Sequence, residues 1–395
     1  MYTGQDRIDN RLNTGFSELR TACIWCLLTL SPLIFMSAIT YGDHTKDVED
    51  LELTKFTVPS DVKLDQVLLK TLATPVNPSD LLLIRGVYGA FPPKVKLSET
   101  DPVVHVAGNE GVFEVTKVGK NIKGYSEGDW VILTSGRLGT WRTHVLVEFP
   151  EGGPEPLFKV KSAGEGGLKD IEGATLSVNP PTAYQLVHNY VKDWNSDGKD
   201  WIVQNAGGSH VAQFLTQFAR LLNVNVLSVI RGGKPNHDEI VSELKLLGAT
   251  AVITEEQAQS EQFRNNELKS IFNGGNVRLA INCLGGALAT ALFLMLSPDG
   301  AMVTYGALTN DPITYPLRWQ QYNNLTTHGY FLTGNTKRNP QLKIDTLNAV
   351  IKLYKLGKLQ VPPATLLEFK DGNLLDLYLQ VIKSGKKGIV KYESN

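Results

Sequence analysis

The sequence predicts an α/β protein in which a doubly wound parallel sheet is inserted within a β-rich domain. Between Trp201 and Tyr305 short apolar strands alternate with helical segments, the pattern of a doubly wound sheet. Before Tyr184 the apolar segments are short and β-like, and after Leu342 two helix–strand pairs follow. We expect these last pairs to complete the first domain. A length of 395 residues allows two domains.

The predicted division has four parts. Residues 1–35 form an N-terminal extension, 36–184 the β-rich catalytic domain, 185–340 the nucleotide-binding domain, and 341–395 the return to the catalytic domain. Lys and Arg number 39 against 40 Asp and Glu, so no charge excess suggests nucleic acid as a partner. Three cysteines cannot make a disulfide framework, which favours a reducing compartment.

The N-terminal extension leaves three interpretations open. The run Ala22–Ile39 is largely apolar and near the minimum length of a membrane span, but Pro32 and polar residues interrupt it. Acidic residues before it are unusual for a mitochondrial presequence. We favour an atypical presequence or an extension absent from the mature protein over a membrane anchor. We interpret Cys23 and Cys26 as residues of the apolar run, not as a metal or redox pair.

The β-rich region is predicted to contain strands at residues 63–72, 111–118 and 129–133, with a surface loop rich in Gly, Pro and Glu over 151–167. In the α/β region and the C-terminal return, the predicted strands cover residues 201–204, 224–230, 251–254, 277–283, 301–305, 365–369 and 388–392. The predicted helices cover residues 209–222, 238–247, 261–272, 287–296, 344–356 and 374–383.

A glycine-containing turn follows the first strand of the α/β region. It reads Ala206-Gly207-Gly208-Ser209-His210-Val211-Ala212 and lies between a strand and a helix. A dinucleotide pyrophosphate binds at such a helix N-terminus, where small residues let the backbone approach. Against the G-x-G-x-x-G/A fingerprint, Ser209 replaces the middle glycine, and any tight strand–helix turn can be glycine-rich. The position of the turn favours a nucleotide.

The next strand ends at Arg231, followed by Gly232-Gly233-Lys234. An acidic residue there binds the ribose 2′-hydroxyl of NAD, whereas cations suit the 2′-phosphate of NADP. Arg231 and Lys234 therefore favour NADP(H) over NAD(H), the alternative being a solvated basic loop.

The sequence contains a set of motifs at residues 74–80 (TPVNPSD), 85–88 (RGVY), 108–111 (GNEG), 139–141, 177–180, 182–184, 228–231 and 304–306. Together they resemble the zinc-free branch of the medium-chain dehydrogenase/reductases, and more narrowly the fungal mitochondrial 2-enoyl thioester reductases. Asn109 stands where zinc alcohol dehydrogenases have a ligand histidine, and Cys283 is the only cysteine beyond residue 26. We therefore expect no metal site.

This resemblance implies a GroES-like catalytic domain carrying an inserted Rossmann domain. It also implies NADPH-dependent reduction of trans-2-enoyl thioesters of acyl carrier protein or CoA, a mitochondrial matrix location with a cytoplasmic alternative, and a homodimer. By similarity Tyr88 donates the proton to C2. Asn77 is either a turn residue before Pro78 or a residue that orients groups near the nicotinamide.

The resemblance and the glycine turn together give the expected cofactor-binding residues. They are Asn179, Gly207, Gly208, Ser209, His210, Val211, Arg231, Lys234, Tyr305, Gly306, Ala307, Leu308, Tyr330, Phe331, Leu332, Thr333 and Lys387.

Departures from the family pattern cluster around this pocket. Gly232-Gly233 replaces an Asp-Arg pair, and His210 replaces a small residue, where it adds bulk or a cationic imidazole. Residues 285–289, 305–308 and 330–331 also differ. Three functions therefore stay open: the enoyl thioester reductase, a quinone, enone or secondary-metabolism enoyl reductase, and a nucleotide-binding paralogue without turnover.

Overall fold

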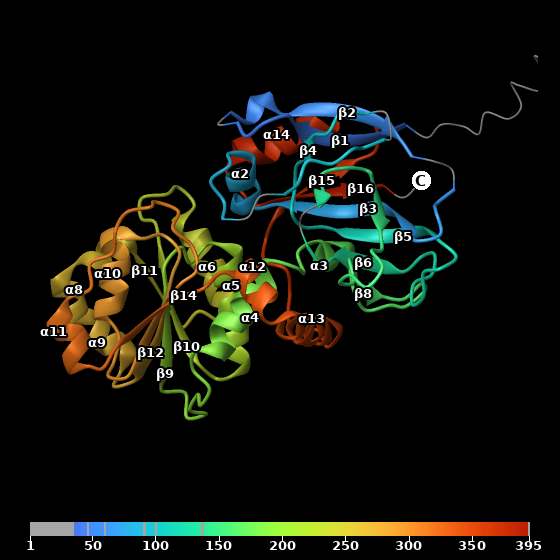
Figure 1. Cartoon of the computed structure of the whole chain (residues 1–395). Coiled ribbons are helices and arrows are strands. Elements are labelled where there is room, and N and C mark those ends of the chain that lie inside the picture. The colour runs from blue at the N-terminus through green and yellow to red at the C-terminus, as the bar shows by residue number, and fades with distance from the viewer. Residues whose placement is uncertain are drawn as a thin grey trace, which may run out of the picture.

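The structure is a computed structural model that describes residues 35–393 except 46, 59–60, 90–91, 99–100 and 136–137. The predicted extension over residues 1–35, with Cys23 and Cys26, lies outside the described residues apart from Phe35. Within the described ranges, no helix combines the length and apolar character needed to cross a membrane. The chain forms a β-rich part and an α/β part, which lie side by side in Figure 1.

The β-rich part holds two sheets. The smaller has the strand order β2-β1-β4 and the larger β15-β16-β3-β5-β6-β8, with β7 also pairing with β3. The strands are β1 Phe35–Tyr41, β2 Glu52–Thr57, β3 Gln66–Val76, β4 His105–Val106, β5 Val112–Val118, β6 Trp130–Leu133, β7 His144–Glu148, β8 Leu157–Lys161, β15 Thr365–Phe369 and β16 Gly388–Tyr392. Its helices are α2 Pro78–Ile84, α3 Asp170–Ala174 and α14 Leu374–Ser384, with the 3-10 turn η1 at Val48–Asp50. The C-terminal strands β15 and β16 belong to the larger sheet.

Two predictions in this part were wrong in detail. The strand expected at residues 63–72 is β3, which starts at Gln66 and leaves Leu64 54% exposed. The loop expected over 151–167 contains β8, which pairs antiparallel with β6. Leu157 and Val160 of β8 are buried in two different apolar cores, so one buried side chain toward each core accompanies a strand in a segment dominated by loop residues.

The α/β part is a six-stranded parallel sheet with the order β11-β10-β9-β12-β13-β14. Its strands are β9 Asp200–Gln204, β10 Asn225–Ile230, β11 Ala251–Thr254, β12 Asn276–Asn282, β13 Ala301–Thr304 and β14 Thr326–Gly329. Its helices are α5 His210–Leu221, α6 His237–Leu247, α7 Glu255–Gln259, α8 Glu261–Asn265, α9 Glu267–Phe272, α10 Gly286–Leu294, α11 Leu317–Tyr322 and α12 Leu332–Arg338. The strand order reverses between β9 and β12, which defines the switch point where such sheets bind ligands.

Helices cover both faces of this sheet (Figure 1). Successive residues of β9 alternate between two cores: Ile202 packs with Phe214 of α5, whereas Trp201 and Val203 pack with Leu292 of α10. This burial on both faces explains the nearly continuous apolar strands of the sequence. The helix predicted over 261–272 is divided into α8 and α9 at Asn266, which ends one helix and begins the next.

Helices α4 (Asn179–Asn189) and α13 (Pro340–Lys355) join the two parts. Helix α4 runs across residue 184, and Gln185 Nε2 donates a hydrogen bond of 3.2 Å to Thr346 Oγ1 of α13. Val112 of the β-rich sheet and Leu347 of α13 belong to one apolar core. The two parts are therefore held together by a shared core.

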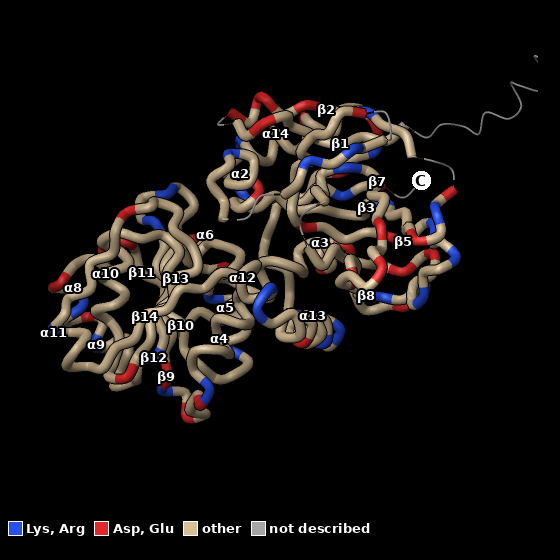
Figure 2. Tube along the Cα trace, viewed as in Figure 1, with Lys and Arg blue, Asp and Glu red and all other residues tan. Residues whose placement is uncertain are grey.

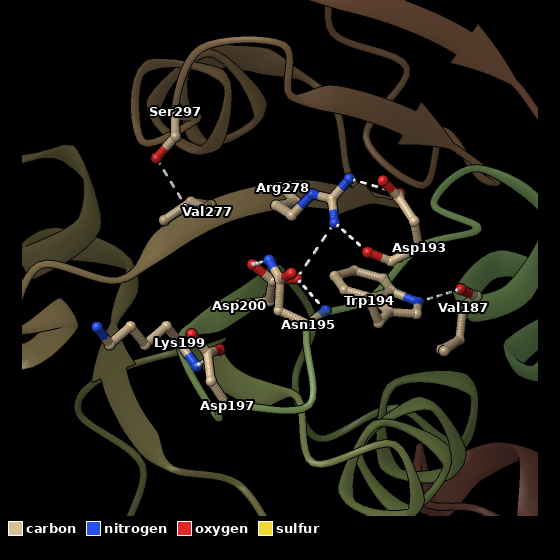
Figure 3. A network of polar contacts seen from close by, with 10 residues as sticks. All are labelled: Val187, Asp193, Trp194, Asn195, Asp197, Lys199, Asp200, Val277, Arg278 and Ser297. Carbon is tan, nitrogen blue, oxygen red and sulfur yellow. Dashed lines mark hydrogen bonds and ion pairs between the residues drawn. The ribbon is translucent and has the colours of Figure 1, made fainter.

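An ion network ties the amino ends of β9 and β12 together (Figure 3). Arg278 lies 2.7 Å from Asp193 and 3.2 Å from the fully buried Asp200, which also accepts hydrogen bonds from Asn195. This network lies at the end of the sheet opposite the carboxyl ends of the strands. Elsewhere Figure 2 shows acidic and basic residues interspersed over both parts of the chain.

Candidate active site

A cavity of about 660 Å³ lies between the α/β part and the β-rich part. The α/β part contributes the turn after β9 and the segment after β13, and the β-rich part contributes α2 and the turn between α14 and β16. Among the described residues that line it are Lys337, Lys343, Lys386 and Lys387, and none is Asp or Glu. Such a lining suits an anionic ligand.

The turn after β9 is shaped for close approach of a ligand. A Cβ on Gly207 would lie 2.8 Å from Ser228 Cβ, so only glycine lets the turn pack against β10. Gly208 has open space where its Cβ would be and lines the cavity. Ser209 caps α5 by accepting a hydrogen bond of 3.3 Å from the Ala212 N–H. The first turn of a helix leaves backbone N–H groups without helical acceptors, an arrangement that suits an anion.

His210, the first residue of α5, is 7% exposed. Its Nε2 is 3.1 Å from the carbonyl oxygen of Pro363, while Nδ1 has no partner among the described residues. Burial, with a contribution from Lys387, lowers its pKa to about 3. His210 is therefore neutral at physiological pH, so of the two effects expected from the sequence only its bulk applies, not a cationic imidazole.

Asn77 lies at the centre of a buried hydrogen-bond network. Its Nδ2 donates to Glu110 Oε2 at 2.8 Å, and its Oδ1 accepts from Asn179 Nδ2 at 3.0 Å and from Lys387 Nζ. The backbone N–H of Asn77 donates to Asp80 Oδ2 at 2.7 Å. The network thus links α2, β16 and the start of α4.

Glu110 holds the segment that leads into α4. Its Oε1 accepts hydrogen bonds from the backbone N–H groups of Ser177 at 2.9 Å and Val178 at 2.8 Å. Burial raises the pKa of Glu110 and lowers the pKa of Lys387, and each charge favours the charged form of the other. Burial also raises the pKa of Asp80 to about 7.

Tyr88 lies in the loop after α2 and lines the same cavity. Its ring contacts Phe331 edge-on, with centroids 5.7 Å apart. Burial raises its pKa, and a hydrogen bond to the Thr333 side chain opposes that shift. The phenol is therefore protonated at neutral pH and available as a proton donor.

Tyr305 and Tyr330 lie deeper in the pocket. Burial raises the pKa of Tyr305, and its hydroxyl is hydrogen-bonded with Cys283 and Ser209. Tyr330 Oη donates to Gln185 Oε1 at 3.0 Å. Burial raises the pKa of Cys283 to about 11, so its thiol stays protonated.

Most of the predicted site residues line this one cavity. They are Asn77, Tyr88, Asn179, Gly208, Ser209, His210, Val211, Tyr305, Gly306, Ala307, Leu308, Tyr330, Phe331, Leu332, Thr333 and Lys387. Three are not part of its lining: Gly207 is packed beneath the turn, and Arg231 and Lys234 are exposed after β10.

Sequence reasoning missed Glu110, Asp80 and Lys343 as members of this site. The motif at residues 108–111 contained Glu110, but its partners at positions 77, 177 and 178 are distant in sequence. Among the described residues, no group of three or more His, Cys, Asp or Glu side chains is placed to hold a metal ion.

Comparisons with known proteins agree with this geometry. The chain matches the family models of the alcohol dehydrogenase GroES-like domain over residues 63–151 and of the zinc-binding dehydrogenases over residues 210–348. It is 40% identical over 371 residues to a mitochondrial enoyl-[acyl-carrier-protein] reductase of Debaryomyces hansenii, covering 90% of this chain and 98% of the relative. It is also 37% identical to an NADPH quinone oxidoreductase of Kluyveromyces marxianus, covering 88% of this chain and 90% of the relative.

Two solved structures share the fold. The mitochondrial 2-enoyl thioester reductase Etr1p/Etr2p heterodimer of Candida tropicalis is 38% identical with a TM-score of 0.83. The complex of Etr1p with NADP and crotonyl-CoA is 37% identical with a TM-score of 0.82. Both comparisons cover 91% of this chain and 100% of the other.

Proposed function

The chain belongs to the fungal mitochondrial 2-enoyl thioester reductases of the medium-chain dehydrogenase/reductase superfamily, and from this membership we propose that it reduces trans-2-enoyl thioesters with NADPH. The substrate is an enoyl group on acyl carrier protein or CoA, and the product is the saturated acyl thioester. The observation that carries the proposal is that Tyr88 and the turn at Gly208 line one cavity.

The lining of the cavity fits a dinucleotide. Gly208 leaves room for a pyrophosphate at the start of α5, and Lys387 supplies a positive charge from the β-rich part. Asn179 lies at the start of α4 and lines the cavity beside Asn77, and the hydrogen bond to Asn77 Oδ1 fixes its amide. We assign the cavity-lining residues of the α/β part to cofactor binding.

Reduction of the C2–C3 double bond adds a hydride at C3 and a proton at C2. NADPH supplies the hydride when it is bound. Tyr88 supplies the proton, because its raised pKa keeps the phenol protonated until charge develops on the thioester. Asn77 acts as a positioning residue, since its amide connects Asn179 and Lys387 to the buried carboxylate of Glu110.

The test measures NADPH oxidation by the purified protein with trans-2-hexenoyl-CoA and trans-2-decenoyl-CoA. We expect Tyr88→Phe to reduce kcat by about 100- to 10,000-fold, the usual contribution of a positioned general acid, with little change in the Kd of NADPH. Tyr125→Phe, at a half-buried tyrosine between β5 and β6 that does not line the cavity, is the matched control and keeps full activity. Binding of NADPH without thioester-dependent oxidation by the wild type would refute the proposal and leave a paralogue without turnover.

A second candidate is quinone or enone reduction, which the similarity to the Kluyveromyces marxianus protein favours. Hydride transfer to a quinone places charge on an oxygen that water can protonate, so this reaction does not need Tyr88. Running the same assay with a benzoquinone separates the two: quinone turnover that survives Tyr88→Phe, without thioester turnover, would support the second candidate.

We further propose that the protein forms a homodimer through the outer edge of the six-stranded sheet. Strand β14 is an edge strand, and all four of its residues are exposed. The preceding helix α11 exposes Leu317 (78%), Trp319 (39%) and Tyr322 (76%). An unpaired edge next to an apolar patch is typical of an interface.

Sedimentation velocity tests this interface. We expect Trp319→Glu to convert the dimer to a monomer, whereas Leu246→Glu, at an equally apolar exposed position on α6, leaves it a dimer. An unchanged dimer in the Trp319 variant would exclude the β14 edge as the dimer interface.

Following the relatives named mitochondrial, we place the enzyme in mitochondria. Fractionation of cells that express the full chain tests this location.

A further inference from the structure

A carboxylate lies against the turn that follows β10. A Cβ built on Gly232 would be 2.6 Å from Glu256 Oε2 and 3.4 Å from Oε1, so the carboxylate occupies the space beside the Gly232 backbone. The sequence places this carboxylate 24 positions after Gly232. The local sequence from Arg231 to Lys234 contains cations and no carboxylate, so it does not reveal Glu256.

The sheet explains how Glu256 reaches this position. Strands β10 and β11 pair in parallel, with Ile230 opposite Thr254, so their carboxyl ends lie side by side. Helix α7 begins directly after β11, and Glu256 belongs to its first turn. A hydrogen bond with the Thr254 side chain lowers the pKa of Glu256, so the carboxylate is ionised at neutral pH.

The same position receives the adenosine ribose in a doubly wound sheet. The dinucleotide crosses the turn after the first strand, and its ribose 2′ group is read at the carboxyl end of the neighbouring strand, here β10. The Gly207 turn is attached to β10 by the hydrogen bond of the Gly207 N–H to the Val229 carbonyl, 2.9 Å. A carboxylate there accepts a hydrogen bond from a 2′-hydroxyl and repels a 2′-phosphate.

Charges of opposite sign therefore lie where the ribose 2′ group is expected. Arg231 and Lys234 are exposed on the same turn and attract a phosphate, whereas Glu256 favours a hydroxyl. We infer that Glu256 is a specificity-determining residue that narrows the preference for NADPH over NADH and allows the enzyme to use both. This inference rests on the proposed dinucleotide-dependent function.

The experiment compares Kd values of NADPH and NADH for the full chain, measured by the fluorescence of the reduced nicotinamide. We expect Glu256→Gln to raise the affinity ratio of NADPH to NADH at least about fivefold, since it removes one like charge near the phosphate and one charged acceptor for the hydroxyl. Glu255→Gln, at the adjacent acidic residue of the same helical turn, leaves the ratio unchanged.

Competition by 2′,5′-ADP and 5′-AMP repeats the comparison at the adenosine end alone, and we expect Glu256→Gln to shift their ratio in the same direction. An affinity ratio within twofold of the wild-type value in Glu256→Gln would overturn the inference. Loss of enoyl thioester turnover with both cofactors still bound would overturn the proposed function instead and would leave the ratio measurable.

Discussion

Replacement of Glu110 tests whether the buried network holds the site together. Glu110 is 1% exposed and accepts hydrogen bonds from Ser177 N–H, Val178 N–H and Asn77 Nδ2. Glu110→Ala leaves two buried donors and the part-buried Val178 N–H without this acceptor. At about 1 to 3 kcal/mol for each unsatisfied donor, the free energy of unfolding falls by about 3 to 9 kcal/mol. A loss of this size approaches the whole stability of a typical domain, about 5 to 15 kcal/mol.

Glu110→Gln separates the charge from the hydrogen bonds. A glutamine carbonyl still accepts from Ser177 and Val178, but its amide faces the amide of Asn77, and Lys387 loses a neighbouring negative charge. We expect a loss of about 2 to 4 kcal/mol. Glu114→Gln, at a half-buried glutamate of the following strand β5, should change stability by less than about 0.5 kcal/mol.

Denaturation in guanidinium chloride, followed by tryptophan fluorescence, measures these differences. From the most to the least stable, we expect the wild type together with Glu114→Gln, then Glu110→Gln, then Glu110→Ala. If the free energy of unfolding of Glu110→Ala lies within about 1 kcal/mol of the wild-type value, water replaces the carboxylate as hydrogen-bond acceptor. The network would then not be what fixes the start of α4.

Three further predictions concern pH, the glycine turn and the distal ion network. Burial raises the pKa of Asp80 from 3.8 to about 7. Between these pH values the folded state therefore binds a proton more tightly than the unfolded state. As a consequence, the free energy of unfolding falls as pH rises from about 4 to 7. Asp80→Asn flattens that slope, and an unchanged slope would assign it to another group. Gly207→Ala lowers the free energy of unfolding by about 1 to 3 kcal/mol through the contact with Ser228. Gly208→Ala leaves the free energy of unfolding unchanged and weakens NADPH binding about tenfold or more. Equal effects of the two changes would contradict the geometry of the turn. Arg278→Met leaves Asp200 charged and buried and costs about 3 kcal/mol, with an unchanged Kd for NADPH at the opposite end of the sheet.

The sequence predicted the strands of the α/β part that are buried on both faces, but it missed strand β7 and helix α4, which also bury side chains. Strands β9 to β13 were predicted from apolar runs that helices cover on both faces. Strand β14 was missed because all its residues are exposed, so no hydrophobic pattern marks it. Strand β8 was missed because the glycine, proline and glutamate residues around it are typical of a loop.

The site was predictable where a motif is continuous in sequence. Residues 208–211 and 305–308 lie in single turns of the chain and all line the cavity. The contacts of Glu110 and Glu256 are with residues distant in sequence, at positions 77, 177 and 178 and at position 232, and only the folded chain brings them together. The exposed position of Arg231 and the neutral state of His210 follow from packing that the local sequence does not reveal.

The place of β16 in the large sheet has a consequence for biosynthesis. Residues 388–391 pair with residues 73–76 at one edge of β3, between β3 and β15. Synthesis proceeds at about 5 to 20 residues per second, so this edge of β3 waits about 15 to 60 s for its partner. During that time an apolar strand edge is open to aggregation. A premature stop codon before Gly388 would remove this interior strand from the sheet.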